Sequence, residues 1–177
     1  MYLESDRLAL KPMTKEHILL IHQKNCYPEV AAFNTIGIPK TIERTEALLQ
    51  PIFADQQNQK RTRYAWTVFN KETDTFVGEI GMILAAEKFK SGEIYYGLLP
   101  EQWGKGYASE AAKRVLRFGF QELQLHRIEA GVACENHKSI RLLEKIGMKR
   151  EGLRRKNLPI RGEWQDSYAY AILEEEL

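Results

Sequence analysis

The sequence lacks the features of a secreted, disulfide-rich or membrane-spanning protein. Its two cysteines, Cys26 and Cys134, lie far apart without CxxC spacing, so neither a disulfide framework nor a structural zinc site is expected. No run approaches the ~18 consecutive apolar residues of a membrane span. Charged residues between Glu4 and Lys11 interrupt the N-terminus, where a signal peptide would need an apolar core. We therefore expect a cytoplasmic protein that contains no metal.

The sequence also lacks a strong excess of charge of one sign. Lys and Arg number 26 and Asp and Glu 24, which gives a net charge of +2. A protein built to coat nucleic acid normally carries a marked basic excess, so direct nucleic-acid binding is not expected. With 177 residues, 44% of them hydrophobic, and no linker or internal repeat, the chain is predicted to form one domain over residues 1–177.

Hydrophobic periodicity predicts a mixed α/β domain. The patterns indicate helices over 14–24, 42–53, 107–123 and 139–146, and strands over 5–12, 64–69, 76–84, 93–99, 127–133, 149–160 and 163–173. Three consecutive strands with short links predict an antiparallel meander. The strand–helix–strand passage over 93–133 predicts one parallel pair with a right-handed crossover. The expected fold class is therefore α/β, with a largely antiparallel sheet around one parallel pair.

The most informative segment is a turn between a strand and a helix, which reads Trp103-Gly104-Lys105-Gly106-Tyr107-Ala108. Two glycines permit a left-handed backbone and the close approach of a ligand. Free N–H groups at the start of the following helix, with the positive end of its dipole behind them, favour a phosphate or pyrophosphate. The alternative is an ordinary glycine-rich turn.

Two common phosphate-binding patterns fit this turn poorly. In the dinucleotide fingerprint G-x-G-x-x-G/A, Gly104 and Gly106 match, but Ser109 stands at the third position. Glu129 on the next strand mimics the ribose-binding acid, yet only one strand–helix–strand unit is evident where two halves are needed. The turn does not match a Walker A loop, because no Gly-Lys-Ser/Thr follows four variable residues.

A third pattern fits better. The turn resembles motif A of the GNAT superfamily of N-acetyltransferases, Q/R-x-x-G-x-G/A, with Trp103, Gly106 and Ala108 at its defined positions. An aromatic residue at the first position is familiar in the RimJ/RimL-type branch. Residues 135–148, from Glu135-Asn136 through Ser139 to Gly147-Met148, look like motif B of the same branch, and the first strand with Ser5-Asp6-Arg7-Leu8 also resembles it.

The resemblance implies acetyl transfer from acetyl-coenzyme A to an amine acceptor. The acceptor is a protein N-terminal α-amine, such as that of a ribosomal protein, or a small-molecule amine. The pyrophosphate of coenzyme A is expected on the backbone of Trp103, Gly104, Lys105, Gly106, Tyr107 and Ala108. The two parallel strands are expected to separate around the pantetheine arm, with an amide of Leu98 or Leu99 polarising the thioester carbonyl and Asn136 contacting pantetheine.

The transfer also needs an acid for the departing thiolate and a route for the amine proton. Ser139 is the candidate acid, with Tyr107 and Tyr168 as alternatives; Asn136 and Ser139 equally suit helix capping.

Glu79 is the candidate base, acting through water, and Glu93 and His126 are alternatives. Each of these three is also explained as a solvated side chain, and an amine that arrives neutral needs no base.

Other interpretations remain open. The chain is alternatively a non-catalytic acyl-coenzyme A binding or sensing module, or a nicotinamide-binding protein. Cys134 with His126 or His137 suggests a thiol nucleophile, although neighbouring Cys and His residues are weak evidence. A homodimer is expected by resemblance only.

The near balance of charge hides one basic segment. Residues 138–161 contain nine basic and two acidic residues, whereas residues 162–177 contain five acidic residues and no Lys or Arg. This segment is either a solvated face or a docking site for anions. In the second case, Lys138 or Arg141 lies near the coenzyme A phosphates and residues 154–156 border the acceptor.

Overall fold

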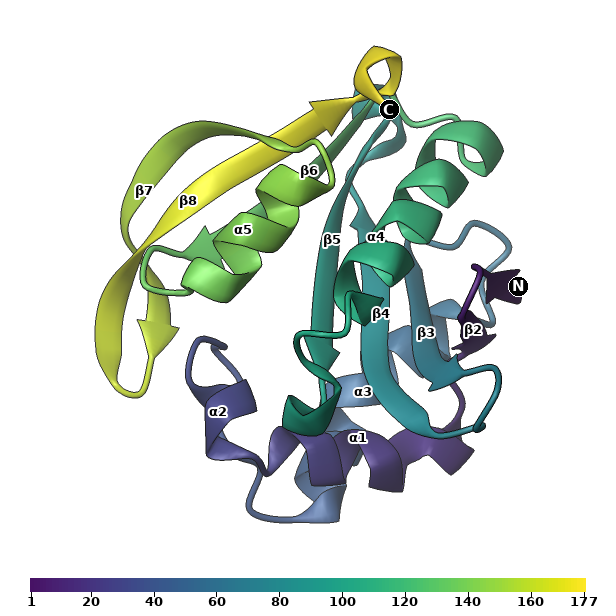
Figure 1. The fold of residues 1–177 in the computed structure, drawn as a ribbon, viewed down its shortest axis with the longest axis vertical. Coiled ribbons are helices and arrows are strands. Elements are labelled where there is room, and N and C mark those ends of the chain that lie inside the picture. The colour runs from purple at the N-terminus through teal and green to yellow at the C-terminus, as the bar shows by residue number, and fades with distance from the viewer.

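One eight-stranded sheet runs through the molecule, and helices cover both of its faces (Figure 1). This computed structural model describes residues 1–177. The strands lie in the order β1 (Leu3–Glu4), β2 (Leu8–Pro12), β3 (Arg63–Asn70), β4 (Phe76–Leu84), β5 (Ser91–Leu98), β6 (Arg127–Ala133), β8 (Glu163–Leu173) and β7 (Lys149–Ile160). The helices are α1 (Ile18–Asn25), α2 (Pro28–Ala31), α3 (Ile42–Asp55), α4 (Tyr107–Arg117) and α5 (His137–Lys145).

The sheet confirms the predicted fold class. Every neighbouring pair is antiparallel except β5 and β6, which are parallel and are connected through α4. Strands β3, β4 and β5 form the predicted meander. The structure also contains four short 3-10 turns, at Lys15–His17, Glu87–Phe89, Pro100–Gln102 and Glu174–Glu176. No helix in the structure is long and apolar enough to cross a membrane.

The structure differs from the predicted elements in three places. The strand predicted over 5–12 begins only at Leu8, because the Ser5 amide and hydroxyl both bond the Leu8 backbone in a tight turn, and the short strand β1 before this turn is not predicted. The short helix α2 carries too few residues for a periodic signal and is not predicted. The helix predicted over 107–123 ends at Arg117 and continues as a π-helical turn, Phe118–Glu122.

The two faces of the sheet carry separate cores, because alternate side chains of each strand point to opposite faces. Ile80, Met82 and Ile94 belong to the larger core beneath α4 and α5. Ala65 belongs to the smaller core, which also includes Leu49 of α3. The central strands are therefore buried on both sides, and a side chain's position in the strand decides which core it meets.

A polar clamp joins the N-terminal segment to the start of α4. The Glu110 carboxylate, in the first turn of that helix, accepts from the Ser5 hydroxyl at 2.7 Å and from the Arg7 backbone N–H at 2.8 Å. The Arg7 guanidinium pairs with the same carboxylate at 2.7 Å and donates to the Lys105 carbonyl at 3.1 Å. The clamp fixes the glycine-containing turn relative to β1 and β2.

Replacing Glu110 by Gln is expected to destabilise the protein by about 1–2 kcal/mol at pH 7, because three charge-assisted hydrogen bonds lose their acceptor charge. Burial alone would raise the pKa of Glu110, but hydrogen bonds from Arg7 and Ser5 bring it below the ordinary glutamate value. The difference in the free energy of unfolding between the two proteins should therefore reach its maximum at pH values above that ordinary value. It should shrink as the pH falls through the pKa of Glu110 in the folded protein. Urea unfolding at several pH values measures it.

The matched control is Glu122→Gln, which removes the carboxylate that pairs with Arg114 at 3.3 Å and is 40% exposed. An exposed pair contributes little, so this variant should lie within about 0.5 kcal/mol of wild type. Equal losses in the two variants would contradict a special role for the clamp.

Candidate functional site

The parallel strands β5 and β6 separate shortly after they meet. Their pairing runs only from Ser91–Arg127 to Glu93–Glu129. Beyond it, β5 stays on β4 as far as Leu98 and β6 stays on β8 as far as Ala133 (Figure 1). The sheet is therefore open between the carboxyl ends of β5 and β6, as expected for strands that hold a ligand between them.

Leu98 presents a free main-chain amide at this opening. The Leu99 N–H donates to the Val77 carbonyl of β4 at 3.0 Å, so that amide is already used. Hydrogen-bonded and non-hydrogen-bonded pairs alternate along antiparallel strands, which makes the adjacent Leu98–Gly78 pair a non-hydrogen-bonded one. The Leu98 N–H and C=O consequently face β6. Of the two predicted residues, only Leu98 has an N–H available to a ligand.

The facing edge of β6 is open in the same way. The Cys134 N–H donates to the Asp166 carbonyl beside β8 at 3.1 Å. By the same alternation, the main-chain groups of Gly131 and Ala133 face away from β8, toward β5. The Ala133 carbonyl accepts from the Asn136 N–H at 2.9 Å, so the groups left unpaired on this edge are the Ala133 N–H and the main-chain groups of Gly131.

The glycine-containing turn lies at the entrance to α4 and has the predicted backbone. Gly104 has φ +76° and Gly106 has φ +81°, both in the left-handed region that glycine favours. No backbone N–H from Gly104 to Ser109 donates to an acceptor within the protein. Such a row of unpaired donors at a helix start suits a pyrophosphate, which requires several hydrogen bonds at once.

Trp103 links this turn to both walls of the opening. Its indole N–H donates to the Leu98 carbonyl at 3.0 Å, and the Lys138 ammonium lies 4.2 Å from the ring centre. Lys138 stands in the first turn of α5, so a cation from the predicted basic segment reaches the turn. The Lys105 ammonium donates to Gln102 at 3.1 Å and stays beside the same turn.

Asn136 caps α5, which is the structural alternative considered for it. Its side-chain oxygen accepts from the Ser139 N–H at 3.2 Å. The amide NH₂ group of Asn136 has no partner within the protein, so capping leaves it available to a ligand.

Ser139 lies near the phenol of Tyr96 on β5. Burial raises the pKa of Tyr96, and the neighbouring Ser139 hydroxyl opposes that rise in part. Tyr96 was missed in the sequence, although its position two residues before Leu98 places both on the α5 face of β5.

Glu79 lies on the opposite face. It is paired with Gly97 across β4 and β5, and its carboxylate contacts the Lys24 ammonium of α1 at 2.6 Å. The phenol of Tyr95 lies on the same face, where burial and the charge of Glu79 both raise its pKa. The candidate acid and the candidate base are therefore separated by the backbone of β5.

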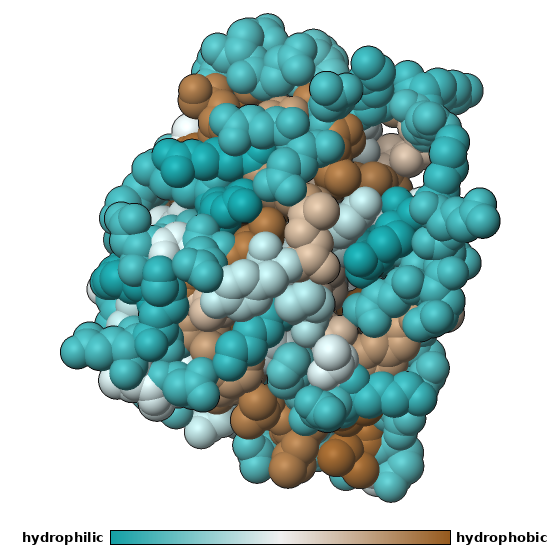
Figure 2. Space-filling model, turned by 90° about the vertical axis from the view of Figure 1, so that its right-hand side faces the viewer, coloured by the Kyte–Doolittle hydropathy of each residue, from teal (hydrophilic) through white to brown (hydrophobic).

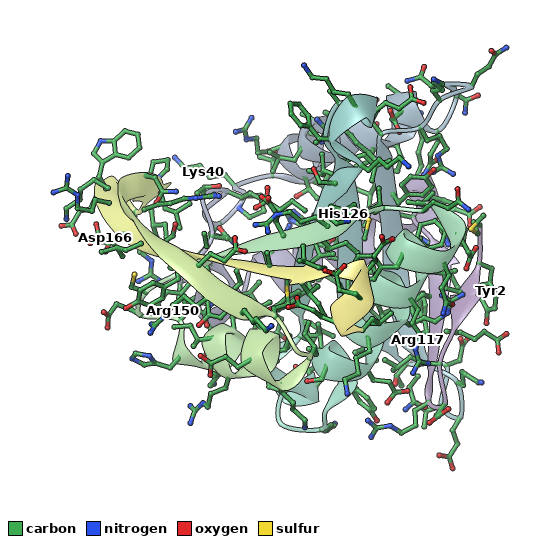
Figure 3. The ribbon with its side chains drawn as sticks, turned by 90° about the horizontal axis from the view of Figure 1, so that it is seen from above. Tyr2, Lys40, Arg117, His126, Arg150 and Asp166 are labelled. Carbon is green, nitrogen blue, oxygen red and sulfur yellow. The ribbon has the colours of Figure 1, made fainter.

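The other candidates lie elsewhere. Glu93 lies in the part of β5 that is paired with β6. His126 lies just before the start of β6, beside Glu174 (Figure 3). The Tyr107 hydroxyl accepts from Asn70 at 3.0 Å, toward β3 rather than α5.

The aromatic ring of Tyr168 packs under Arg150 of the projecting β7–β8 hairpin. The Cys134 thiol has no histidine partner; it is Cys26 that contacts His22, at 3.7 Å.

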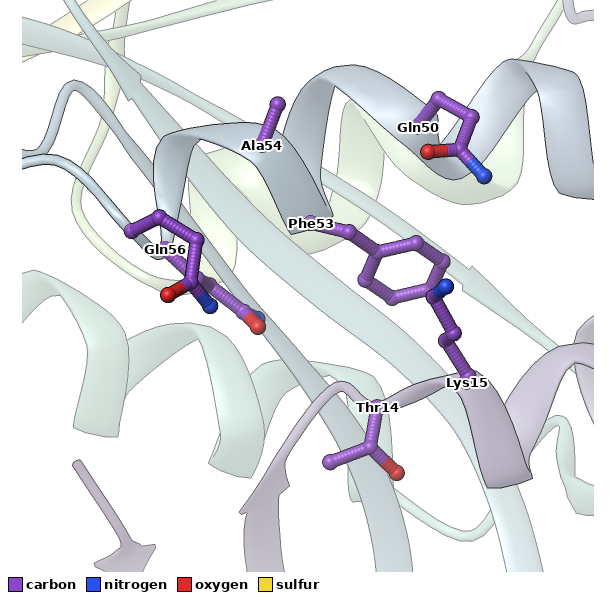
Figure 4. Close-up of a pocket in the computed structure, with 7 residues that line it drawn as sticks. Thr14, Lys15, Gln50, Phe53, Ala54 and Gln56 are labelled. Atoms are coloured by element: carbon purple, nitrogen blue, oxygen red, sulfur yellow. The ribbon is translucent and has the colours of Figure 1, made fainter.

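Two surface features lie apart from the opening. A shallow hollow between the turn at Lys15 and α3 is lined by Thr14, Phe53 and Gln56 (Figure 4) and includes no predicted site residue. The face of the molecule in Figure 2 is largely hydrophilic, with hydrophobic residues near its top, across its middle and at the lower end, where α1 to α3 lie. The main-chain donors remain the feature that indicates a ligand.

Comparison with known proteins agrees with this geometry. Residues 7–149 match the acetyltransferase (GNAT) domain family. The chain belongs to the GNAT acetyltransferase family. It is 33% identical to the uncharacterised N-acetyltransferase YoaA of Bacillus subtilis, over 97% of this chain and 96% of that protein.

Two solved structures are similar over nearly the whole chain. A GNAT-family acetyltransferase from Bacillus anthracis has a TM-score of 0.84 and 34% identity, with 99% of this chain and 100% of that one covered. The spermidine N-acetyltransferase of Vibrio cholerae, in complex with CoA and spermine, has a TM-score of 0.84 and 25% identity, with 96% and 97% covered. Both relatives are acetyltransferases, and the second is described with CoA bound.

Replacing Gly106 by Trp should weaken coenzyme A binding at least tenfold, about 1.4 kcal/mol, because a side chain there enters the row of free N–H groups. Isothermal titration calorimetry with coenzyme A measures the loss. Gly162→Trp is the matched control, since Gly162 has φ +82° and open space around it but lies in the β7–β8 turn. Unchanged affinity in the Gly106 variant would show that the pyrophosphate does not bind at this turn.

Proposed function

We propose that this enzyme is cytoplasmic and transfers an acetyl group from acetyl-coenzyme A to a primary amine, in the manner of the RimJ/RimL-type branch. The observation that carries the proposal is the presence of free main-chain donors at two places, the Leu98 N–H at the opening and the row from Gly104 to Ser109 at the start of α4. The Leu98 N–H polarises the thioester carbonyl, Asn136 contacts pantetheine, and the turn from Trp103 to Ala108 holds the pyrophosphate. A homodimer remains an expectation from the resemblance.

The two faces of β5 divide the proton transfers. On the α1 face, Glu79 receives the proton of the acceptor ammonium, directly or through water, so that the neutral amine forms the new C–N bond. On the α5 face, Ser139 donates a proton to the sulfur as the C–S bond breaks, and the second proton, which the nitrogen loses as the C–N bond forms, returns to the Ser139 oxygen through water. The first proton of the ammonium leaves through Glu79 on the α1 face, and the products are the amide and the free thiol.

The charges near the acceptor side favour an amine without further positive charges. The charge of Glu79 is matched by Lys24, and exposed basic residues occupy 154–156 of β7. Arg161 of the β7–β8 turn donates to the Pro28 carbonyl at 3.3 Å and so joins this hairpin to α2. A peptide N-terminal α-amine suits these surroundings better than a polycation such as spermidine, which the Vibrio cholerae relative is named for.

The proposed function is tested by thiol release from acetyl-coenzyme A with a panel of amines. We expect turnover with short peptides that carry a free N-terminus, and more with acidic than with basic peptides. Spermidine and a simple monoamine are the comparison substrates. Coenzyme A binding without turnover on any of these amines would instead favour a non-catalytic acyl-coenzyme A binding module.

Replacing Ser139 by Ala should lower kcat by about 100-fold, the usual range for a lost general acid, while coenzyme A affinity is retained. The variant keeps the Asn136 cap, which uses only the Ser139 backbone N–H. Ser139→Thr retains a hydroxyl and should recover most of the turnover. Steady-state kinetics with calorimetry separates the two effects, and full turnover in Ser139→Ala would leave Ser139 with a structural role only.

A further inference from the structure

The structure buries one lysine in the smaller of its two cores. Only 3% of the Lys24 side chain is exposed, and its ammonium contacts the Glu79 Oε1 oxygen at 2.6 Å, where 13% of the glutamate side chain is exposed. Lysine is almost never buried without a partner, because an unpaired ammonium loses its hydration. Lys24 and Glu79 therefore depend on each other for charge compensation.

The backbone of β5 leaves room for this pair at Gly97. A Cβ atom at Gly97 would stand 2.7 Å from the Lys24 ammonium and 3.9 Å from Glu79 Oε1. The ammonium thus occupies the space that any other residue would fill. Gly97 directly precedes Leu98, so the pair lies beside the strand end where the thioester is expected.

The second carboxylate oxygen of Glu79 has no partner. Glu79 Oε2 is buried and accepts no hydrogen bond, whereas Oε1 is held by Lys24. A buried polar atom without a partner costs free energy in the free protein and is most simply explained by a donor that arrives with water or substrate. The pair thus leaves one buried oxygen without a hydrogen-bond donor in the free protein.

We propose that Lys24 is the positioning residue for Glu79: it keeps the buried carboxylate ionised and fixes it through Oε1, so that Oε2 is free to receive the amine proton. This inference rests on the proposed function, in which Glu79 is the base. Lys24 itself touches neither the acceptor nor coenzyme A in this scheme.

The other groups around Glu79 leave Lys24 as its main source of compensating charge. Tyr95 of β5 is buried with a raised pKa and stays neutral at physiological pH. Across β3, Thr67 pairs with Glu79 in register and contacts His17, whose pKa is lowered by burial. Arg63 of β3 acts on the Tyr95 phenol. Only Lys24 forms an ion pair with the carboxylate.

Removal of the ammonium should favour the neutral form of Glu79, since a buried carboxylate without a counter-ion is penalised by lost hydration. In Lys24→Met, the acid limb of the pH profile of kcat/KM should move to higher pH by about one pH unit or more. Activity on the acid limb falls, and it returns as pH rises. A merely structural loss would lower the profile without moving its limb.

The decisive measurement is a ¹³C NMR titration of the glutamate carboxyls in the full chain, with Glu79 assigned through Glu79→Gln. The Glu79 signal should change at higher pH in Lys24→Met than in wild type. Lys60→Met is the matched control, because Lys60 pairs with Glu87 at 2.7 Å but both side chains are more than four-fifths exposed. An unmoved Glu79 signal in folded Lys24→Met would overturn the proposal.

A second variant guards against loss of folding. Gly97→Ala retains both charged groups but forces the Lys24 ammonium away, and it should move the Glu79 titration in the same direction. If both variants fold and neither moves it, Lys24 has no such role. The titration requires no turnover, so an inactive wild-type protein would refute the proposed function while the NMR result still decides the role of Lys24.

Discussion

The early end of the β5–β6 pairing is the constraint on which the rest of the site depends. Three residues of each strand pair, and then each strand follows its antiparallel neighbour. Buried main-chain groups are normally paired, so edges left open inside a sheet require a partner from outside. A ligand with alternating amide groups, such as a pantetheine arm, supplies donors and acceptors along such an edge. The opening is therefore a functional feature of the backbone and depends little on side-chain identity.

The elements around the opening keep it from closing. The Trp103 indole N–H donates to the Leu98 carbonyl, and the Lys138 ammonium lies over the same indole ring. These contacts link β5, the glycine-containing turn and α5. On the other side of the turn, Arg7 joins the Lys105 carbonyl to the Glu110 carboxylate. Short polar contacts on both sides thus hold the turn with its N–H groups free. A preformed site of this kind loses less entropy when the ligand binds.

The sequence allowed the backbone features of this site to be predicted, but few of the side-chain contacts. The meander, the parallel pair and the left-handed glycines follow from local patterns, and all are present in the structure. The Lys24–Glu79 contact joins residues 55 positions apart, and an inward-facing lysine in a short helix is indistinguishable from a solvated one by pattern. Tyr96 could have been predicted from the sequence, because it lies two residues before Leu98 and therefore on the same face of β5.

The origin of each group on the chain has a consequence for specificity. The main-chain donors and Ser139 belong to the part of the fold that we propose binds coenzyme A, from β5 to α5, whereas Lys24 comes from α1, on the face of β5 where the proposed mechanism places the acceptor amine. A change in α1 would then alter two properties together: the shape that admits the acceptor and the charge that compensates Glu79. Because a base must match the protonation state of its amine, the proposed role of Glu79 would link acceptor recognition to proton transfer through one buried ion pair.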